Sequence, residues 1–192
     1  MTRYLGLLLL FGWGLAAQAA DPQLIEELRK GGYVLYIRHT STDFSKDDSK
    51  MTSFEDCASQ RPLTDKGRAE ARSIAGHLKR LAIPLDRVYA SPFCRTVETA
   101  MLAFGKAEKT GEARGGPVKS DDPTRYDGLR RLLSMPPAPG RNNAVSSHGN
   151  PFYALFGAPY LAEGEIAVVR PLGETGFALA GKIKLEDWPA LK

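Results

Sequence analysis

The chain has 192 residues, of which 25% are charged and 43% are hydrophobic, and its formal net charge is +4. These values are ordinary for a soluble globular protein and exclude a disordered chain or a fibre, and the length suits one domain with a real core. The mild positive charge favours anionic small substrates. Since the sequence has no basic run interleaved with aromatic residues, we expect no nucleic-acid partner.

Residues 1–20 have the pattern of a secretory signal peptide. Arg3 precedes a leucine-rich apolar core at 4–15, and small residues at 16–20 supply the site that a signal peptidase reads. The apolar core is shorter than the ~20 residues of a membrane span, and no cysteine follows it for lipid attachment. We therefore expect a single mature domain, 21–192, that is exported to the periplasm or secreted without stable membrane insertion; an uncleaved anchor is the alternative.

The mature part alternates between helical and strand patterns. A capped helix at 23–30 precedes an apolar strand at 33–37, which is typical of a strand buried on both faces. Long polar segments at 40–60 and 105–125 show no periodicity. The other expected elements are a helix from the N-cap Thr64 to Leu81, a strand ending before Ser91, a helix at 95–104, a helical turn or two at 129–133, a strand at 143–147 and a strand pair at 166–170 and 177–183. This order predicts an α/β fold, a three-layer α/β/α sandwich with a mostly parallel central sheet.

Both cysteines, Cys57 and Cys94, lie in the mature part. An exported compartment is oxidising and the number of cysteines is even, so we expect a disulfide, with two buried free thiols as the alternative. The bond would tie the polar segment 40–60 to the segment that carries Arg95.

Polar side chains follow three of the expected strands at their carboxyl ends. Arg38 and His39 end the first strand, Arg95 follows the second, and His148 follows the third. Ligands of open α/β sheets bind outside the carboxyl ends of the strands, so we expect these side chains to converge at one edge. Arginine and histidine together favour chemistry on an anion.

Four segments resemble the histidine phosphatase superfamily, which is also called phosphoglycerate-mutase-like. Arg38-His39-Thr40 is similar to the signature triplet, and the other segments are 61–67 (RPLTDKG), 91–100 (SPFCRTVETA) and 147–150 (SHGN), in the family's order. A lone Arg-His pair carries little information, whereas the four segments together are specific. The resemblance implies a phosphoglycerate-mutase-like fold.

The resemblance also implies a role for each residue. His39 would attack phosphorus to give a phosphohistidine that water hydrolyses, which requires its other ring nitrogen to donate to a fixed acceptor. Arg38 and Arg95 would clamp the phosphoryl oxygens, and His148 would donate to the same group. A third polar group from the loop would be Arg61 or Gln60. Neither a metal nor a cofactor is expected.

Two positions depart from the family pattern. Thr40 stands where the triplet usually has glycine, so its side chain would either crowd the phosphate or donate a hydroxyl to it. One branch of the family has its acidic proton donor directly after the second histidine, and this chain has Gly149 at that position. The donor therefore stays open among carboxylates elsewhere: Asp127, Glu163 and Glu165, with Asp43 and Asp47 of the long loop as weaker candidates.

Taken together, these motifs predict an exported, metal-independent phosphatase that hydrolyses a small-molecule or glycolipid phosphomonoester. Phosphoglycerate-mutase-type phosphoryl transfer is the alternative enzyme, although export argues against cytoplasmic substrates. A non-catalytic phosphate-ligand-binding envelope protein with the same fold is the alternative from another class. The sequence leaves the physiological substrate and the oligomeric state open.

Overall fold

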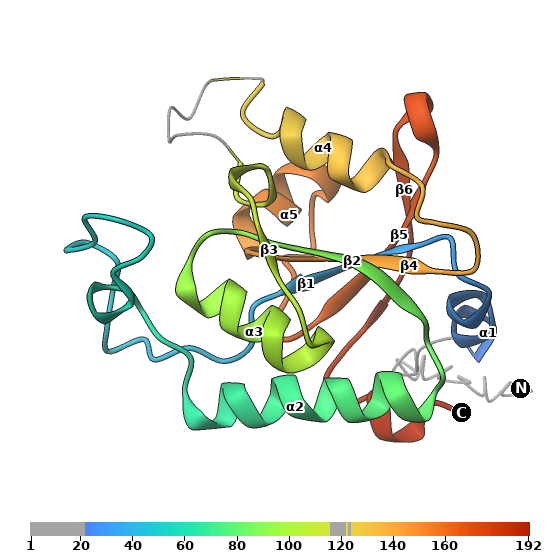
Figure 1. Cartoon of the computed structure of the whole chain (residues 1–192), viewed down its shortest axis with the longest axis horizontal. Coiled ribbons are helices and arrows are strands. Elements are labelled where there is room, and N and C mark those ends of the chain that lie inside the picture. The colour runs from blue at the N-terminus through green and yellow to red at the C-terminus, as the bar shows by residue number, and fades with distance from the viewer. Residues whose placement is uncertain (1–21, 116–121, 123) are drawn as a thin grey trace, which may run out of the picture.

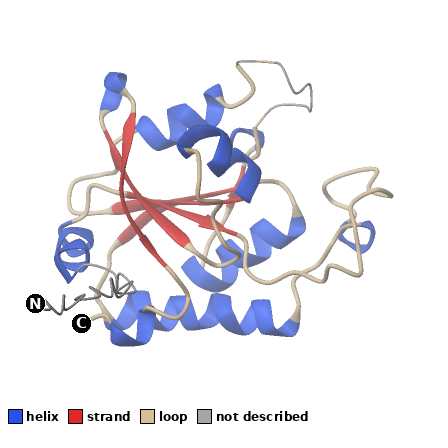
Figure 2. Cartoon of the chain, turned by 180° about the vertical axis from the view of Figure 1, so that it is seen from behind, coloured by secondary structure: helices blue, strands red, loops and turns tan. Residues whose placement is uncertain are grey.

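The computed structural model of the chain describes residues 22–115, 122 and 124–192, so the expected signal peptide lies outside the described residues. A six-stranded sheet with the order β3-β2-β4-β1-β5-β6 forms the middle of the molecule (Figure 1, Figure 2). Its strands are β1 (Val34–Arg38), β2 (Leu85–Ala90), β3 (Glu108–Lys109), β4 (Asn142–Ser147), β5 (Ile166–Pro171) and β6 (Phe177–Ile183).

Helices cover both faces of this sheet. On one face lie α1 (Pro22–Lys30), α2 (Asp65–Arg80) and α3 (Cys94–Phe104), and on the other lie α4 (Asp127–Ser134) and α5 (Gly149–Phe156). The described residues also form short 3-10 helices, which are labelled η1 (Cys57–Ser59), η2 (Gly111–Ala113), η3 (Gly173–Thr175) and η4 (Trp188–Ala190). This arrangement confirms the three-layer α/β/α sandwich.

Side chains of β1 divide the core into two clusters. Leu35 and Ile37 pack with α1, α2 and α3, whereas Val34 and Tyr36 pack with α4 and α5. Alternate residues of a strand point to opposite faces, so a strand between two helical layers needs an unbroken apolar run. The continuous apolar pattern of this segment therefore has a direct structural cause.

Strand pairing brings the functional segments to one edge. β1 and β2 both pair with β4 in parallel, and β2 pairs with β3 in parallel, whereas β5 pairs antiparallel with β1 and β6. In this register Arg38 lies opposite Ser147 and Ala90 lies opposite Ser146. The carboxyl ends of three adjacent parallel strands thus meet at one place.

The structure corrects one expectation and adds one helix that the sequence did not indicate. The segment 105–125 is not structureless where it is described, because β3 extends the sheet beside β2 and η2 follows it. A two-residue strand is too short to show a hydrophobic period. The helix α5 was not predicted, since its sequence GNPFYALF is short and lacks an amphipathic pattern. Among the described residues, no helix has both the length and the apolar character needed to cross a membrane.

Candidate active site

The residues that end three strands line one cavity of about 220 Å³. Arg38 is the last residue of β1 and His39 follows it, Arg95 lies in the first turn of α3, and His148 follows β4. Arg61, from the loop before α2, lines the same cavity. The structure therefore brings together all five site residues that the sequence predicts.

The His39 side chain is buried and held in one orientation. Its Nδ1 lies 3.1 Å from the backbone oxygen of Thr40, and because a carbonyl oxygen only accepts, Nδ1 carries the proton. Burial lowers the pKa of His39 to about 3, the bond to Thr40 opposes this shift, and the charges of Arg95 and Arg38 reinforce it. The neutral ring therefore keeps a lone pair on Nε2, which is what a nucleophilic histidine requires.

His148 lies beside His39, with 5.6 Å between the ring centroids in an edge-on arrangement. Its Nε2 is 2.8 Å from the Ser91 hydroxyl oxygen, and its backbone oxygen accepts from the Tyr36 hydroxyl at 2.6 Å. Burial, followed by the neighbouring charges of His39 and Arg95, holds the pKa of His148 well below its usual value. Since Ser91 occupies Nε2, Nδ1 is the ring nitrogen left for a substrate.

Thr40 neither crowds the cavity nor points its hydroxyl into it. The residue is fully buried, and its hydroxyl lies 3.3 Å from that of Thr99 in α3. Both effects expected from replacing the family's glycine are therefore wrong for this chain. The part of Thr40 that matters to the site is its backbone oxygen, which orients His39.

The cavity has an excess of arginine donors without partners. Five buried side-chain nitrogen or oxygen atoms in the described residues lack a hydrogen bond, and four of them are Nε atoms of arginines that line this cavity. A buried donor without a partner costs about 1–3 kcal/mol, so four together indicate a place built for an anionic acceptor. The four arginines are Arg38, Arg61, Arg95 and Arg125.

Asp48 positions two of these arginines. Its Oδ1 accepts from Arg95 Nη1 at 2.9 Å and from the backbone N–H of Arg61, also at 2.9 Å. Burial raises the pKa of Asp48, but these hydrogen bonds and the Arg95 charge outweigh burial and hold the pKa below its usual value. The sequence analysis missed Asp48, because nothing in the polar segment distinguishes it from neighbouring acids.

A disulfide between Cys57 and Cys94 fixes the loop that carries Asp48 and Arg61. Gln60 reinforces the link, because its Oε1 accepts from the Cys94 backbone N–H at 2.9 Å and its Nε2 donates to the Phe54 backbone oxygen at 3.0 Å. The predicted disulfide is confirmed. Of the two candidates for the third polar group, Arg61 lines the cavity and Gln60 braces the loop behind it.

None of the five carboxylates considered as proton donors lines the described part of the cavity. Glu163 lies behind His39, with its Oε1 3.6 Å from His39 Nδ1 and 3.6 Å from Arg38 Nη2. Glu165 accepts from the Ala162 backbone N–H, and Asp127 is exposed in the first turn of α4. The loop acids, Asp43 and Asp47, accept from nearby serines.

Tyr160 takes the space that an acidic residue at position 149 would need. A Cβ on Gly149 would lie 2.0 Å from the Tyr160 ring, so the ring and a side chain at 149 cannot share this space. The ring lies under the Arg38 guanidinium, and its hydroxyl donates to Asn150 Oδ1 at 2.7 Å. Tyr160 is a cavity residue that sequence reasoning missed, as are Arg114 and Arg125.

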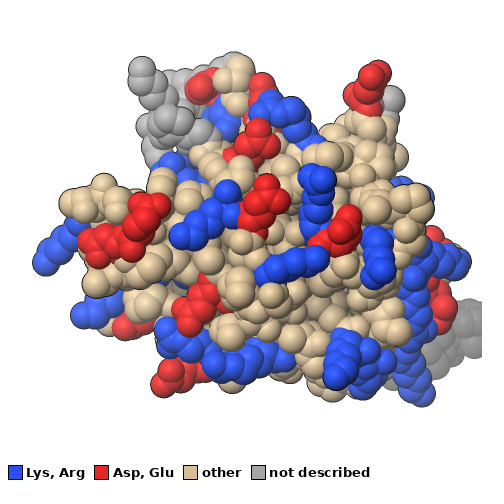
Figure 3. Space-filling model, viewed as in Figure 1, with Lys and Arg blue, Asp and Glu red and all other residues tan. Residues whose placement is uncertain are grey.

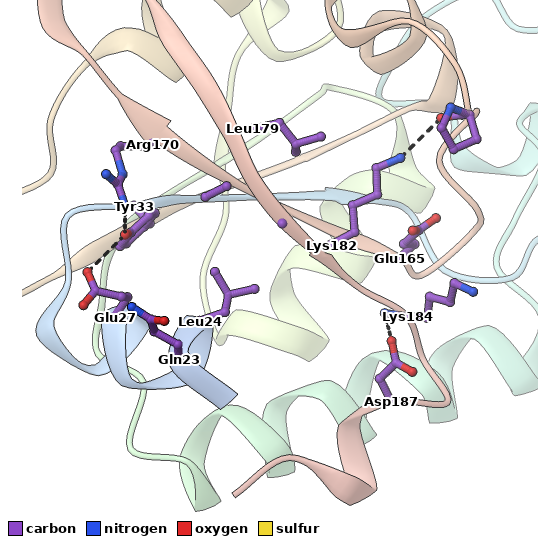
Figure 4. Close-up of a pocket in the computed structure, with 13 residues that line it drawn as sticks. Gln23, Leu24, Glu27, Tyr33, Glu165, Arg170, Leu179, Lys182, Lys184 and Asp187 are labelled. Carbon is purple, nitrogen blue, oxygen red and sulfur yellow. Dashed lines mark hydrogen bonds between the residues drawn. The ribbon is translucent and has the colours of Figure 1, made fainter. Parts of the chain in front are cut away.

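A larger cavity of about 590 Å³ lies elsewhere, between α1 and β6 (Figure 4). Several of its polar groups are hydrogen-bonded to one another, since the Tyr33 hydroxyl bridges Glu27 and Arg170, and Lys182 donates to the Pro159 backbone oxygen. Of the residues predicted for the site, Glu165, one of the candidate proton donors, lines this second cavity, whereas the two histidines and the predicted arginines do not. The described residues also contain no group of His, Cys, Asp and Glu suited to hold a metal ion.

Comparisons with known proteins agree with this geometry. A sequence model described as histidine phosphatase superfamily (branch 1) matches residues 34–114. A search of curated proteins found no match. The protein histidine phosphatase SixA complexed with tungstate is 23% identical, with a TM-score of 0.53 and coverage of 81% of this chain and 98% of its own.

Two further solved structures are similar. A phosphoserine phosphatase mutant from Entamoeba histolytica is 13% identical with a TM-score of 0.54, covering 81% of this chain and 98% of its own. YhfR from Bacillus stearothermophilus is 17% identical with a TM-score of 0.53, covering 80% and 98%. At such identities these structures show the fold. The family match over residues 34–114, together with the fold and the motifs, supports the histidine phosphatase superfamily and a phosphatase or phosphoryl-transfer activity.

Proposed function

We propose that the protein is an exported phosphatase that hydrolyses phosphomonoesters through a covalent phosphohistidine on His39. The observation that carries this proposal is the buried, neutral His39, whose Nδ1 proton is fixed on Thr40 and whose cavity is lined by arginine Nε atoms without partners. A neutral nucleophile beside fixed cations suits attack on a phosphate.

In the first step, the His39 Nε2 lone pair attacks phosphorus, an N–P bond forms and the ester P–O bond breaks. Arg38, Arg61 and Arg95 hold the phosphoryl oxygens, because guanidinium groups donate in a forked geometry that matches them. Little covalent chemistry is left for the protein beyond positioning and charge stabilisation. The leaving oxygen takes a proton from water, since no carboxylate lines the described cavity.

In the second step, a water molecule attacks the phosphohistidine. The N–P bond breaks, its electron pair returns to His39 Nε2, and the attacking water releases its proton to solvent as inorganic phosphate forms, which balances the proton that the leaving oxygen took from solvent in the first step. His148 donates to the phosphoryl group through Nδ1 in both steps, since Ser91 occupies its Nε2. Glu163 acts as a positioning residue, because it contacts the Nδ1 side of His39 rather than the attacking nitrogen.

Export is the second part of the proposal. The signal-like residues 1–20 and the Cys57–Cys94 disulfide support it, because such bonds persist in oxidising compartments. Expression of the full chain in a bacterium should place the protein in the periplasmic or secreted fraction, and its first residue should be near Asp21. Protein that stays in the cytoplasm with Met1 intact would overturn this part.

The catalytic proposal is tested with His39→Ala and the matched control His77→Ala. His77 lies outside the cavity, where its ring stacks on Trp188. His39→Ala should abolish hydrolysis of phenyl phosphate while leaving thermal unfolding nearly unchanged, and the control should keep the activity. Rapid quenching of wild type with a radiolabelled phosphomonoester should trap an acid-labile, base-stable phosphoprotein that His39→Ala does not form.

Retained hydrolysis in His39→Ala would refute the nucleophile assignment. Wild-type protein that binds phosphomonoesters without releasing phosphate would be a binding protein. Transfer of the phosphoryl group to a second hydroxyl instead of to water would indicate a mutase.

A further inference from the structure

The cavity contains more positive charge than one phosphoryl group needs. Five arginines line it, and two carboxylates lie within ion-pair distance of them: Glu163 beside Arg38 and Asp48 beside Arg95. Because burial keeps both histidines neutral, the five arginines and two carboxylates give this part of the site a net charge of about +3. A phosphoryl dianion neutralises two of these positive charges.

On the face of the molecule seen in Figure 3, basic and acidic side chains are interspersed over most of the surface, with more basic than acidic ones at the lower right. The mixture of signs over most of this face contrasts with the cavity wall, where arginines outnumber the carboxylates beside them.

Two of the five arginines, Arg114 and Arg125, come from segments other than those that carry the proposed phosphoryl clamp, although Arg114 and Arg95 lie over the same Phe93 ring. Arg114 follows η2, which the Ser147 hydroxyl anchors to the end of β4 by donating to the Ala113 backbone oxygen. Arg125 precedes α4. The two segments touch, because a Cβ on Gly115 would lie 2.5 Å from the Tyr126 ring.

Aromatic rings hold both guanidinium groups in place. Arg114 lies over Phe54 at 5.3 Å and over Phe93 at 5.5 Å from the ring centroids, and the Phe93 ring in turn contacts His148. Arg125 lies over Tyr126 at 5.1 Å. A guanidinium group stacked on a ring keeps its N–H edges free to donate to an anion in its own plane.

Neither arginine has a counter-charge in the described chain. Arg114 and Arg125 form no ion pair with a described carboxylate, and Arg125 Nε is buried without a hydrogen-bond partner. The charge of Arg114 also contributes to lowering the pKa of His148, so Arg114 is close enough to interact electrostatically with the site. Two ring-stacked guanidinium groups that form no ion pair with a described carboxylate therefore line the same cavity as the two histidines.

We propose that Arg114 and Arg125 bind a second anionic group of the substrate. The preferred substrate class is then a phosphomonoester whose organic part also carries a carboxylate or a second phosphate. This inference rests on the proposed phosphatase function, because the arginines act on the same bound molecule.

Matched probes test the proposal. 4-Carboxyphenyl phosphate is compared with its neutral amide, 4-carbamoylphenyl phosphate, and 1,4-phenylene bisphosphate is compared with phenyl phosphate. The measured quantity is the ratio of kcat/KM within each pair. Wild type should prefer the probe with the additional anion, and the larger ratio of the two pairs shows whether carboxylate or phosphate fits better.

Arg114→Gln and Arg125→Gln should each lower this ratio by about tenfold or more, mainly through KM, because each removes a charge-assisted hydrogen bond. Arg114→Lys, which keeps the charge and loses the fork, should give an intermediate ratio. Arg141→Gln is the charge-matched control, since Arg141 is exposed just before the opposite end of β4, and it should leave the ratio unchanged.

Unchanged ratios in both glutamine variants, with folding verified by thermal unfolding, would overturn the second subsite while wild-type turnover of the neutral probes upheld the phosphatase. If wild type hydrolyses no probe, the proposed function fails. Calorimetric binding of the same pairs to wild type and variants then decides the subsite alone: an arginine-dependent preference supports it, and equal affinities refute it.

Discussion

The disulfide offers the sharpest test of how the loop supports the site. The change is the double variant Cys57→Ala, Cys94→Ala, which removes the bond and introduces no charge. Cys57 is exposed and Cys94 is half-buried, so little packing is lost with the sulfur atoms. The effect on stability should therefore come almost entirely from opening the loop.

The size of that effect follows from the length of the loop. The two cysteines are 37 residues apart in sequence. In the chain-entropy description, closing a loop of this length removes enough freedom from the unfolded chain to stabilise the fold by about 4 kcal/mol. Arg61 lies inside this closed loop, and Asp48 lies in the segment just before Cys57 and bonds Arg61 and Arg95, so the variant should also lose kcat/KM under conditions in which it is still folded.

Urea unfolding measures the first effect, and hydrolysis of phenyl phosphate at low urea measures the second. Addition of a reductant should bring wild type to the stability of the double variant and leave the double variant unchanged, which separates the bond from other actions of the reductant. A loss of less than 1 kcal/mol would contradict the loop-closure reasoning. A full loss of stability with unchanged kcat/KM would show that the loop does not hold the arginines.

Three further predictions concern protonation, a buried amide and metal dependence. Burial lowers the pKa of His39 and His148, so below pH 6.5 the unfolded chain binds protons that the folded chain does not, and stability falls as pH falls. Urea unfolding at pH 5.5 should give a free energy of unfolding that is about 1.4 kcal/mol lower than at pH 8 from His39 alone, with a further loss from His148, and a flat profile would contradict neutral burial. Asn142→Ala should lower the free energy of unfolding by about 3 kcal/mol or more. The side-chain amide of Asn142 is fully buried and forms hydrogen bonds with three main-chain groups, including the backbone oxygens of Leu28 and Pro84. A loss below 1 kcal/mol would show that water replaces the amide. Because arginines supply the positive charge of the site, hydrolysis should survive excess chelator, and a strict requirement for a divalent ion would refute the mechanism.

Sequence reasoning found the part of the site that regular structure positions. Arg38, His39 and His148 adjoin the carboxyl ends of buried strands, and parallel pairing alone brings those ends together. Arg95 follows from the same rule, since α3 begins where β2 ends. The fold class could be predicted for a similar reason. A strand that is buried between two helical layers must be apolar along its whole length, and this continuous apolar run is visible in the sequence.

The residues that sequence reasoning missed are placed by loops. Asp48 differs from Asp43 and Asp47 only in the path of its loop, which the disulfide and Gln60 determine. Arg114 and Arg125 depend on packing between two irregular segments. Such contacts have no period and no fixed spacing, so the sequence holds no local signal for them.

The packing of Tyr160 against Gly149 constrains how this site can change by substitution. An aspartate at position 149 would displace the ring, and with it the stacking contact to Arg38, before it could serve as a proton donor. The two positions are therefore epistatic, and a variant that gains an acid at 149 gains a usable one only if Tyr160 is first reduced to a small residue. If the acid is introduced at position 149 first, Tyr160 and its contact with Arg38 are disturbed and activity should fall. If Tyr160 is replaced by a small residue first, the acid can be added afterwards without this clash.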